Sequence, residues 1–282
     1  MKISLLTASF VLALIGACQA RNSPGPASRP EAPPVGITPD PAPLPKEKPL
    51  GTLSLDEILA KLRQRTSGMR SYQAEIHYLF IQDPELLDSR TLRRGIIYYQ
   101  RGEGRSRLRV NFNTIQQDDA PQRERLEQFF FDGVWLTKID HELKTVDLYQ
   151  QAEEDNPQDV FDYISHNFPI VGFSSTETLR GQFDIGITDQ PADPNKPIRL
   201  HLKVKPDSVY KDDYRDIDFS IDSRTWLPLR VVAKSTEDDI YDIQFVKAAV
   251  NKNLENSVFV IETPESFSKN RHPLKKDRER EK

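Results

Sequence analysis

The chain has 282 residues, enough for one large domain or two small ones, and 37% of them are hydrophobic, which permits a packed core. Its formal net charge is −4, but residues 269–282 carry seven Lys and Arg against three acidic residues, which leaves about −8 on the rest. An acidic domain repels phosphate, so the composition argues against nucleic-acid binding, and a single cysteine at position 18 excludes internal disulfides.

The N-terminus has the pattern of an export signal. Lys2 precedes an apolar stretch over 3–17 that is too short to cross a bilayer as a permanent helix, and small residues lead into Cys18. This pattern resembles a bacterial lipobox, which implies a signal peptide over 1–17 and acylation of Cys18 as the membrane anchor. The alternative is an ordinary secretory signal cut after Ala20, which would discard Cys18.

Residues 18–50 are predicted to form a disordered tether. Ten of the 21 prolines lie within 21–50, and proline favours extended polyproline II conformations. Such a segment would hold a folded domain over 51–268 away from an anchored Cys18. The basic stretch 269–282 is predicted to be a disordered tail, although a contact with anionic lipid or a partner is the alternative.

A helix is expected at the start of the domain. Ser54 and Glu57 form a capping box, and the helix should end near Gly68. Its apolar stripe has helical spacing and consists of Leu55, Ile58, Leu59 and Leu62.

After this helix the apolar period changes to two, which is typical of half-buried strands. Asp132 and Gly133 predict a tight hairpin turn, because glycine accepts positive φ without steric cost. The expected strands cover 72–80, 93–101, 105–112, 126–131, 134–139, 143–149, 183–187, 198–204, 217–221, 227–233, 240–246 and 257–261.

A second helix is expected to interrupt the strands, with Asn156 as N-cap, Pro157 at its first position and Pro169 at its end. Its apolar face would consist of Val160, Phe161 and Ile164, and a short helical turn is expected over 176–180. These elements predict a mainly β (α+β) fold, a curved antiparallel sheet of about 11 strands with helices over one face.

No catalytic or metal-binding motif is visible in the sequence. The five histidines do not pair with each other or with cysteine at ligand spacing, and nucleophile-elbow, P-loop and dinucleotide-binding patterns are missing. Acidic clusters at 153–155, 212–213 and 237–239 are expected in turns between strands. The sequence therefore predicts no metal, no cofactor and no enzymatic activity, and favours binding of an apolar ligand.

Three groups of motifs together resemble one family. They are Ser71 to Ile76 with Gly95 to Arg101 and Ser106 to Val110; Phe131 to Leu136 with Ile139, Asp140, Lys144 and Val146; and Trp226 to Leu229 with Asp242 to Val246, Asn253, Phe259 and Pro264. Their order over most of 54–267 resembles the bacterial outer-membrane lipoprotein-sorting proteins LolA and LolB. The resemblance implies an incomplete β-barrel closed by a helical lid around an apolar cavity for acyl chains.

The resemblance also implies roles for particular residues. Lid residues would be Leu55, Leu59, Leu62, Val160, Phe161 and Ile164, and cavity walls would include Tyr78, Phe80, Ile97, Val110, Phe130, Leu136 and Leu229. The alternative for each of them is ordinary core packing. The buried arginine of the carrier would correspond to Arg107 or Arg109.

Leu86 and Leu87, flanked by acidic residues and Pro84, are candidates for membrane contact, with packing back onto a helix as the alternative. The expected partners are lipid or lipoprotein acyl chains, a membrane reached through the lipid on Cys18, and an envelope protein. We therefore expect a periplasm-facing protein, anchored to the cell envelope, that helps to localise lipoproteins or lipid, with the outer membrane favoured over the inner one as its location. The alternative function is a non-transporting sensor or scaffold module on the same fold.

Overall fold

The computed structural model describes residues 49–102, 105–160 and 176–274. The predicted signal peptide, Cys18 and nearly all of the predicted tether lie outside the described residues, as do Phe161 and Ile164. The described helices are α2 (Leu55–Ser67), α4 (Thr176–Gln182) and the 3-10 helix η1 (Asn256–Phe259). The strands are β1 (Ser71–Gln82), β2 (Ser89–Arg101), β3 (Ser106–Gln117), β4 (Arg123–Phe131), β5 (Trp135–Asp140), β6 (Thr145–Gln150), β7 (Phe183–Asp189), β8 (Ile198–Val204), β9 (Tyr214–Ile221), β10 (Pro228–Ser235), β11 (Ile240–Val250) and β12 (Ser268–His272).

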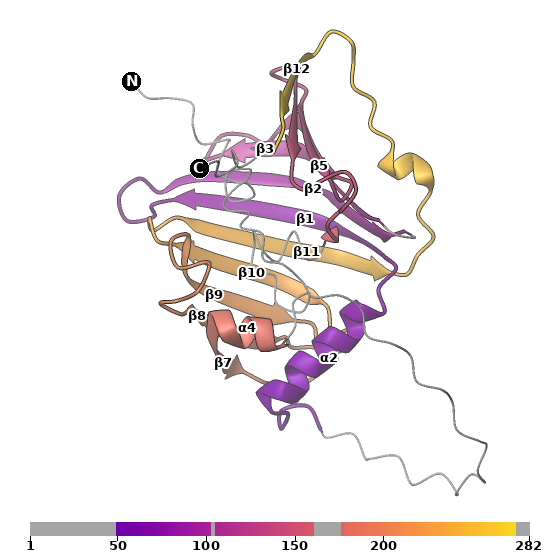
Figure 1. The fold of residues 1–282 in the computed structure, drawn as a ribbon. Helices are drawn as coiled ribbons and strands as arrows, with labels where there is room; N and C mark the ends of the chain where they lie inside the picture. Colours follow the sequence, from indigo (N-terminus) through magenta and orange to yellow (C-terminus); the bar gives the residue numbers. More distant parts are fainter. Residues whose placement is uncertain (1–48, 103–104, 161–175, 275–282) are drawn as a thin grey trace, which may run out of the picture.

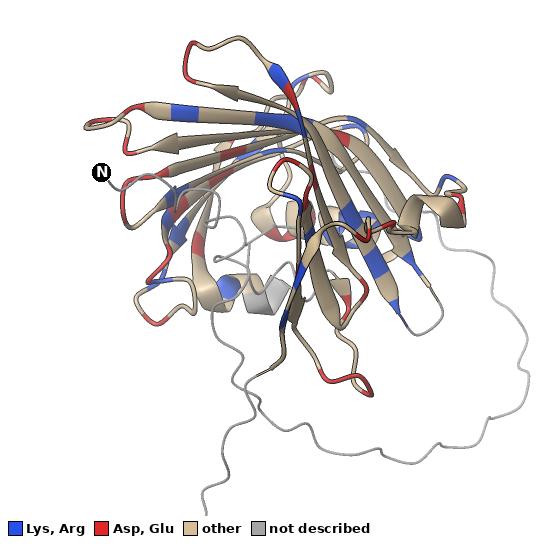
Figure 2. Cartoon of the chain, turned by 90° about the horizontal axis from the view of Figure 1, so that it is seen from above, with Lys and Arg blue, Asp and Glu red and all other residues tan. Residues whose placement is uncertain are grey.

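All these strands belong to one sheet, in the order β12-β6-β5-β4-β3-β2-β1-β11-β10-β9-β8-β7. Neighbours pair antiparallel except β12 and β6, which are parallel. The sheet bends into an open arch, and α2 and α4 lie in front of its β7–β10 half (Figure 1). Seen from above, the acidic residues gather mainly in the turns at the strand ends (Figure 2), and the three predicted acidic clusters do lie in turns.

Helix α2 forms where its caps and stripe predict it. The Ser54 hydroxyl accepts a hydrogen bond from the Glu57 amide at 3.3 Å, and the Glu57 carboxylate accepts one from the Ser54 amide at 2.7 Å. The helix ends at Ser67, with Gly68 as its C-cap. The capping box fixes the start of α2, so that its apolar stripe faces the sheet.

One face of the sheet, together with α2 and α4, forms the hydrophobic core; we call it the concave face and the opposite one the outer face. On β1, Ala74, Ile76, Tyr78 and Phe80 are buried while the residues between them are half-buried, as side chains alternate along a strand. On β8 and β9, Leu200, Leu202, Ile217 and Phe219 are fully buried. A single core therefore runs across the sheet.

The structure differs from the predicted secondary structure at two places after β11. Residues Asn256–Phe259 form η1 and not a strand, and Ser268–His272, assigned mostly to the disordered tail, form β12 beside β6. Residues 251–267, called here the C-terminal strap, connect β11 to β12 along the outer face (Figure 1).

The predicted second helix begins later than expected. Residues 157–159 are not helical, and Val160 is the first helical residue. Its amide donates to the hydroxyl of Ser106 at 2.8 Å, and that hydroxyl donates to Asp159 at 2.7 Å. Thus a serine from β3 accepts a hydrogen bond from the amide of the first helical residue.

The predicted hairpin turn is present between β4 and β5. Gly133 has φ +97°, and the Asp132 carboxylate accepts hydrogen bonds from the Val134 and Trp135 amides. The predicted turn over 176–180 is α4. Within the described ranges, no helix combines the length and apolar character needed to span a membrane.

Candidate ligand-binding site

The concave face of β1–β5 carries a run of three aromatic side chains, Tyr78 of β1, Phe112 of β3 and Phe129 of β4. The strand register places Tyr78 beside Arg93, Ile97 beside Val110, and Phe112 beside Glu127. Ring centroids of Tyr78 and Phe112 are 6.1 Å apart, and those of Phe112 and Phe129 are also 6.1 Å apart, within the range of aromatic pairs. Burial raises the pKa of Tyr78 above its usual range, so its hydroxyl stays neutral. The three rings are buried, so this part of the concave face belongs to the apolar core.

Most of the predicted wall residues lie on this concave face. Tyr78, Phe80, Val110 and Leu136 are buried in the core cluster, and Ile97 is half-buried against it. On α2, Leu59 and Leu62 are buried and Leu55 is half-buried. Val160 is fully buried in the same cluster. Their burial is compatible both with core packing and with a ligand-contacting wall.

Two predicted wall residues lie outside the core cluster, and the structure corrects the facing of one of them, Phe130. Phe130 is half-buried and outside the core cluster, whereas its neighbours Phe129 and Phe131 belong to that cluster, so strand alternation puts Phe130 on the outer face. Leu229 is half-buried at a β-bulge between Pro228 and Arg230, also outside the cluster. The sequence analysis did not include Phe112, Phe129 and Phe131 among the wall residues. Their apolar side chains in predicted strands were the signal that could have indicated them.

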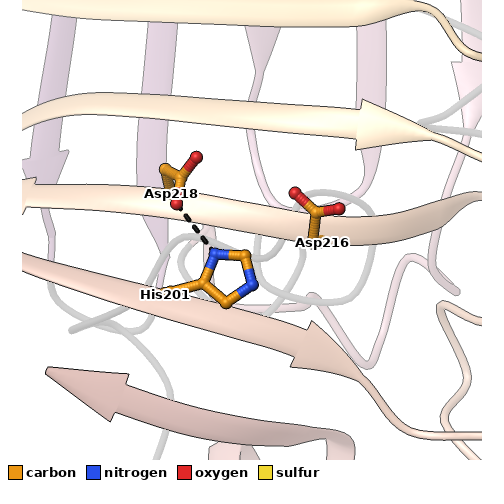
Figure 3. A group of neighbouring side chains, drawn as sticks. All are labelled: His201, Asp216 and Asp218. Carbon is orange, nitrogen blue, oxygen red and sulfur yellow. Dashed lines mark hydrogen bonds and ion pairs between the residues drawn. The ribbon is translucent and has the colours of Figure 1, made fainter. Parts of the chain in front are cut away.

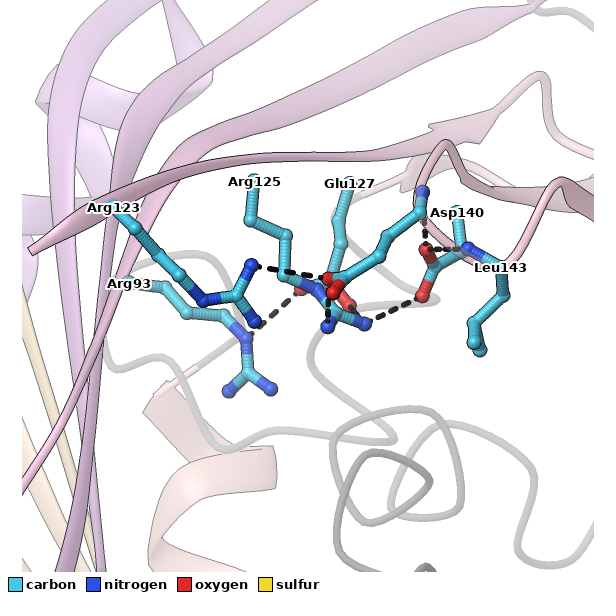
Figure 4. Close-up of polar contacts among 7 residues, drawn as sticks. Arg93, Arg123, Arg125, Glu127, Asp140 and Leu143 are labelled. Atoms are coloured by element: carbon cyan, nitrogen blue, oxygen red, sulfur yellow. Dashed lines mark hydrogen bonds and ion pairs between the residues drawn. The ribbon is translucent and has the colours of Figure 1, made fainter.

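A charge network (Figure 4) borders the aromatic run, because the register pairs its Glu127 with Phe112. Arg125 is bound to Glu127 at 3.2 Å, to Asp140 at 2.7 Å and to Glu142 at 2.5 Å, while Arg93 donates to Glu127 at 2.9 Å. The side chains of Glu127 and Asp140 are only 3% and 1% exposed, so these charges depend on their partners. Burial lowers the pKa of Arg125, but the three surrounding carboxylates outweigh it and raise the pKa overall.

Arg93 links this network to the apolar surface. Its guanidinium group lies 6.0 Å from the ring centroid of Tyr78, at the limit for a cation–π contact. The apolar run thus ends at a charged group on the same face of the sheet, and the site has an apolar part and a polar end.

The arginines that the sequence resemblance suggested lie elsewhere. Arg109 donates to the carbonyl oxygens of Val258 and Val260 at 2.6 and 3.0 Å, and Arg107 lies over the ring of Phe259 at 4.6 Å. Both therefore bind the C-terminal strap on the outer face, and burial lowers the pKa of Arg109. Arg93 and Arg125 are the arginines of the concave network.

Leu86 and Leu87 lie in the turn between β1 and β2 and point into solvent, with exposed fractions of 84% and 61%. The turn is held by Asp83, whose carbonyl oxygen accepts from the amides of Leu86, Leu87 and Asp88. The Asp83 amide in turn donates to Asp239 at 3.0 Å. Both leucines are thus presented outward, and the alternative of packing back onto a helix is wrong.

Comparisons with known proteins give structural neighbours alone. No protein-family model and no curated protein sequence matches the chain. Among solved structures it is similar to the lipoprotein LppX of Mycobacterium tuberculosis, with 12% identity and a TM-score of 0.42 over 72% of this chain and 100% of that one. It is also similar to a LolA superfamily protein of Nitrosomonas europaea, with 12% identity and a TM-score of 0.33 over 74% and 99% of the two chains.

A third similar structure is the MucA/MucB complex of Pseudomonas aeruginosa, with 11% identity and a TM-score of 0.41. The match covers 73% of this chain and 60% of that one, so the chain spans less than two thirds of the length of this neighbour. The LolA superfamily, which the sequence motifs resemble, is thus represented among the structures similar to this chain.

Proposed function

We propose that this protein binds acyl chains of lipids or lipoproteins on the concave face of β1–β5 while it is anchored to the bacterial envelope. The observation that carries the proposal is the aromatic run through Tyr78, Phe112 and Phe129, which ends at the Arg93–Glu127 pair. The hydrocarbon part of an acyl chain would pack on the aromatic run, and the polar group at its end would lie near the Arg93–Glu127 pair.

Two further features support a position at a membrane. The lipobox-like sequence at Cys18 would provide a covalent anchor, and the proline-rich segment would give the domain reach. Leu86 and Leu87 would contact the bilayer through a turn that Asp83 holds in shape. Because Asp83, Glu85 and Asp88 surround the leucines, this contact would favour zwitterionic over anionic lipid.

The acyl-binding experiment compares two adjacent isoleucines of β2. Ile96 and Ile97 are both half-buried, but only Ile97 packs against the concave core cluster. We expect the chain purified from a lipid-containing host to carry acyl adducts in native mass spectrometry and to bind a fluorescent fatty acid. Ile97→Gln should weaken the binding of the fluorescent fatty acid, whereas Ile96→Gln on the outer face should leave it unchanged.

An absence of adducts together with no fatty-acid binding would contradict acyl binding and would favour the sensor or scaffold function. The membrane contact is tested separately by sedimentation with phosphatidylcholine vesicles, using a chain with Cys18→Ser so that no anchor contributes. Binding that persists in a Leu86→Ser, Leu87→Ser variant would exclude the turn as the contact.

A further inference from the structure

A histidine and two aspartates come together on the outer face of the sheet, far from the aromatic run in the strand order. His201 lies on β8, and Asp216 and Asp218 lie on β9 (Figure 3). The register pairs His201 directly with Asp218, and Asp216 is two residues away on the same face. Their concave-face neighbours Leu200, Leu202, Ile217 and Phe219 are fully buried, so a rigid, packed pair of strands holds the three side chains.

The three residues offer a nitrogen and two carboxylate oxygens within 4.8 Å of one another. Nδ1 of His201 lies 2.8 Å from Oδ1 of Asp218. Oδ1 of Asp216 is different: the atom is shielded from solvent and accepts no hydrogen bond, although the Asp216 side chain as a whole is 23% exposed. The nearest cation recorded for it is Nζ of Lys234, at 3.7 Å.

The ion pair with Lys234 is too long for a hydrogen bond, so this shielded carboxylate oxygen keeps an unused acceptor position. A bound cation would satisfy this oxygen. We propose that His201, Asp216 and Asp218 form a binding site for a divalent transition-metal ion of the zinc type. Imidazole nitrogen with carboxylate oxygen suits zinc, whereas magnesium and calcium prefer oxygen ligands alone.

The charges around the site set its affinity. Lys203 lies opposite Asp216 in the register on β8, and Lys234 lies opposite it on β10. Arg230 is bound by Asp242, whose two oxygens accept from it at 2.8 and 2.6 Å, and its charge also acts on Asp218. Lys234 therefore competes directly with a cation for Asp216, and its removal strengthens metal binding.

The test is calorimetric titration of the full chain with zinc chloride, and with magnesium chloride for comparison. All variants carry Cys18→Ser, because a free thiolate is itself a zinc ligand. We expect one zinc ion per chain and much weaker magnesium binding. His201→Ala and Asp216→Asn should each weaken zinc binding by about tenfold or more, since even outer-shell losses cost that much.

Two control variants make the result specific. His141→Ala removes a histidine that contacts Gln128 and the ring of Phe267, away from the cluster, and should leave zinc binding unchanged. Lys234→Met should tighten zinc binding, because it removes the cation that competes for Asp216. If Asp216 did no more than pair with Lys234, this substitution would not affect zinc binding. Zinc binding that survives in the His201→Ala, Asp216→Asn double variant would overturn the proposal, and so would no binding by the unsubstituted site.

Discussion

At the scale of single residues, the charge network of Figure 4 contributes to the stability of the fold only while each buried charge keeps its partners. Asp140 is 1% exposed, and its two oxygens have separate tasks. One accepts from Arg125, and the other accepts from the amides of Glu142 and Leu143 at 3.0 and 2.9 Å. Arg125 also has a buried Nε without a hydrogen-bond partner, so its charge depends on the carboxylates that contact its other two nitrogens.

We expect Asp140→Ala to lower the free energy of unfolding by about 3 kcal/mol, because it removes one partner from a buried ion pair and two backbone acceptor contacts. Arg123→Ala is the matched control, since Arg123 and its partner Glu142 are both about half exposed and the pair is worth less than about 1 kcal/mol. Urea unfolding at unchanged m-value measures both. Equal losses in the two variants would show that burial of the network contributes nothing to stability.

At the scale of secondary-structure elements, Gly95 allows β2 and β3 to approach at a β-bulge on the concave face. The register between the two strands shifts between Arg94 and Gly95. A Cβ at this position would overlap the carbonyl oxygen of Asn111 and would lie 2.8 Å from the Cα of Phe112. Because those atoms are backbone, no rotamer change relieves the overlap, and β3 would have to move away.

Gly95→Ala should therefore destabilise the protein by at least about 2 kcal/mol, near the upper range for overpacking. Gly186 in β7 is the matched control, because a Cβ there meets nothing within 4 Å. Gly186→Ala should be neutral or slightly stabilising, since glycine weakens a strand interior. Thermal unfolding followed by circular dichroism distinguishes the two, and an unchanged melting temperature for Gly95→Ala would contradict the close approach.

At the scale of the whole molecule, the core contains several tyrosines whose ionisation opposes folding. Burial raises the pKa of Tyr210 to about 12 and that of Tyr241 to about 12, from 10.0. Burial also raises the pKa values of Tyr72, Tyr78 and Tyr214. Above about pH 10 the unfolded chain loses these protons while the folded chain keeps them, so stability falls as the pH rises.

The stabilisation from Tyr210 is thus complete below about pH 10 and is lost as the pH rises to about 12. We expect Tyr210→Phe to show a smaller fall in the free energy of unfolding between about pH 9 and about pH 11.5 than the unsubstituted protein. Urea unfolding at both pH values measures this difference. The same fall in both proteins would mean that Tyr210 ionises as freely in the folded chain as in the unfolded one.

Local patterns predicted much of this fold, and non-local pairing accounts for the rest. The capping box of Ser54 and Glu57 and the Asp132-Gly133 turn act within a few residues, so the sequence was sufficient for them. The run Phe129 to Phe131 is apolar at every position, so it has no alternation to reveal which rings face inward. The metal-site residues lie on different strands, and only the register of β8 and β9 brings them together.

The position of β12 has a consequence for how this molecule behaves in a crowded compartment. A sheet edge that displays free amides and carbonyls invites strands of other chains and nucleates aggregates. Here the chain returns along the outer face and places its own Ser268–His272 against β6, with every residue of that strand exposed and none of them aliphatic or aromatic apart from His272. Hydrophilic and positively charged side chains thus line this edge of the sheet. They disfavour the pairing of a strand from another chain at this edge.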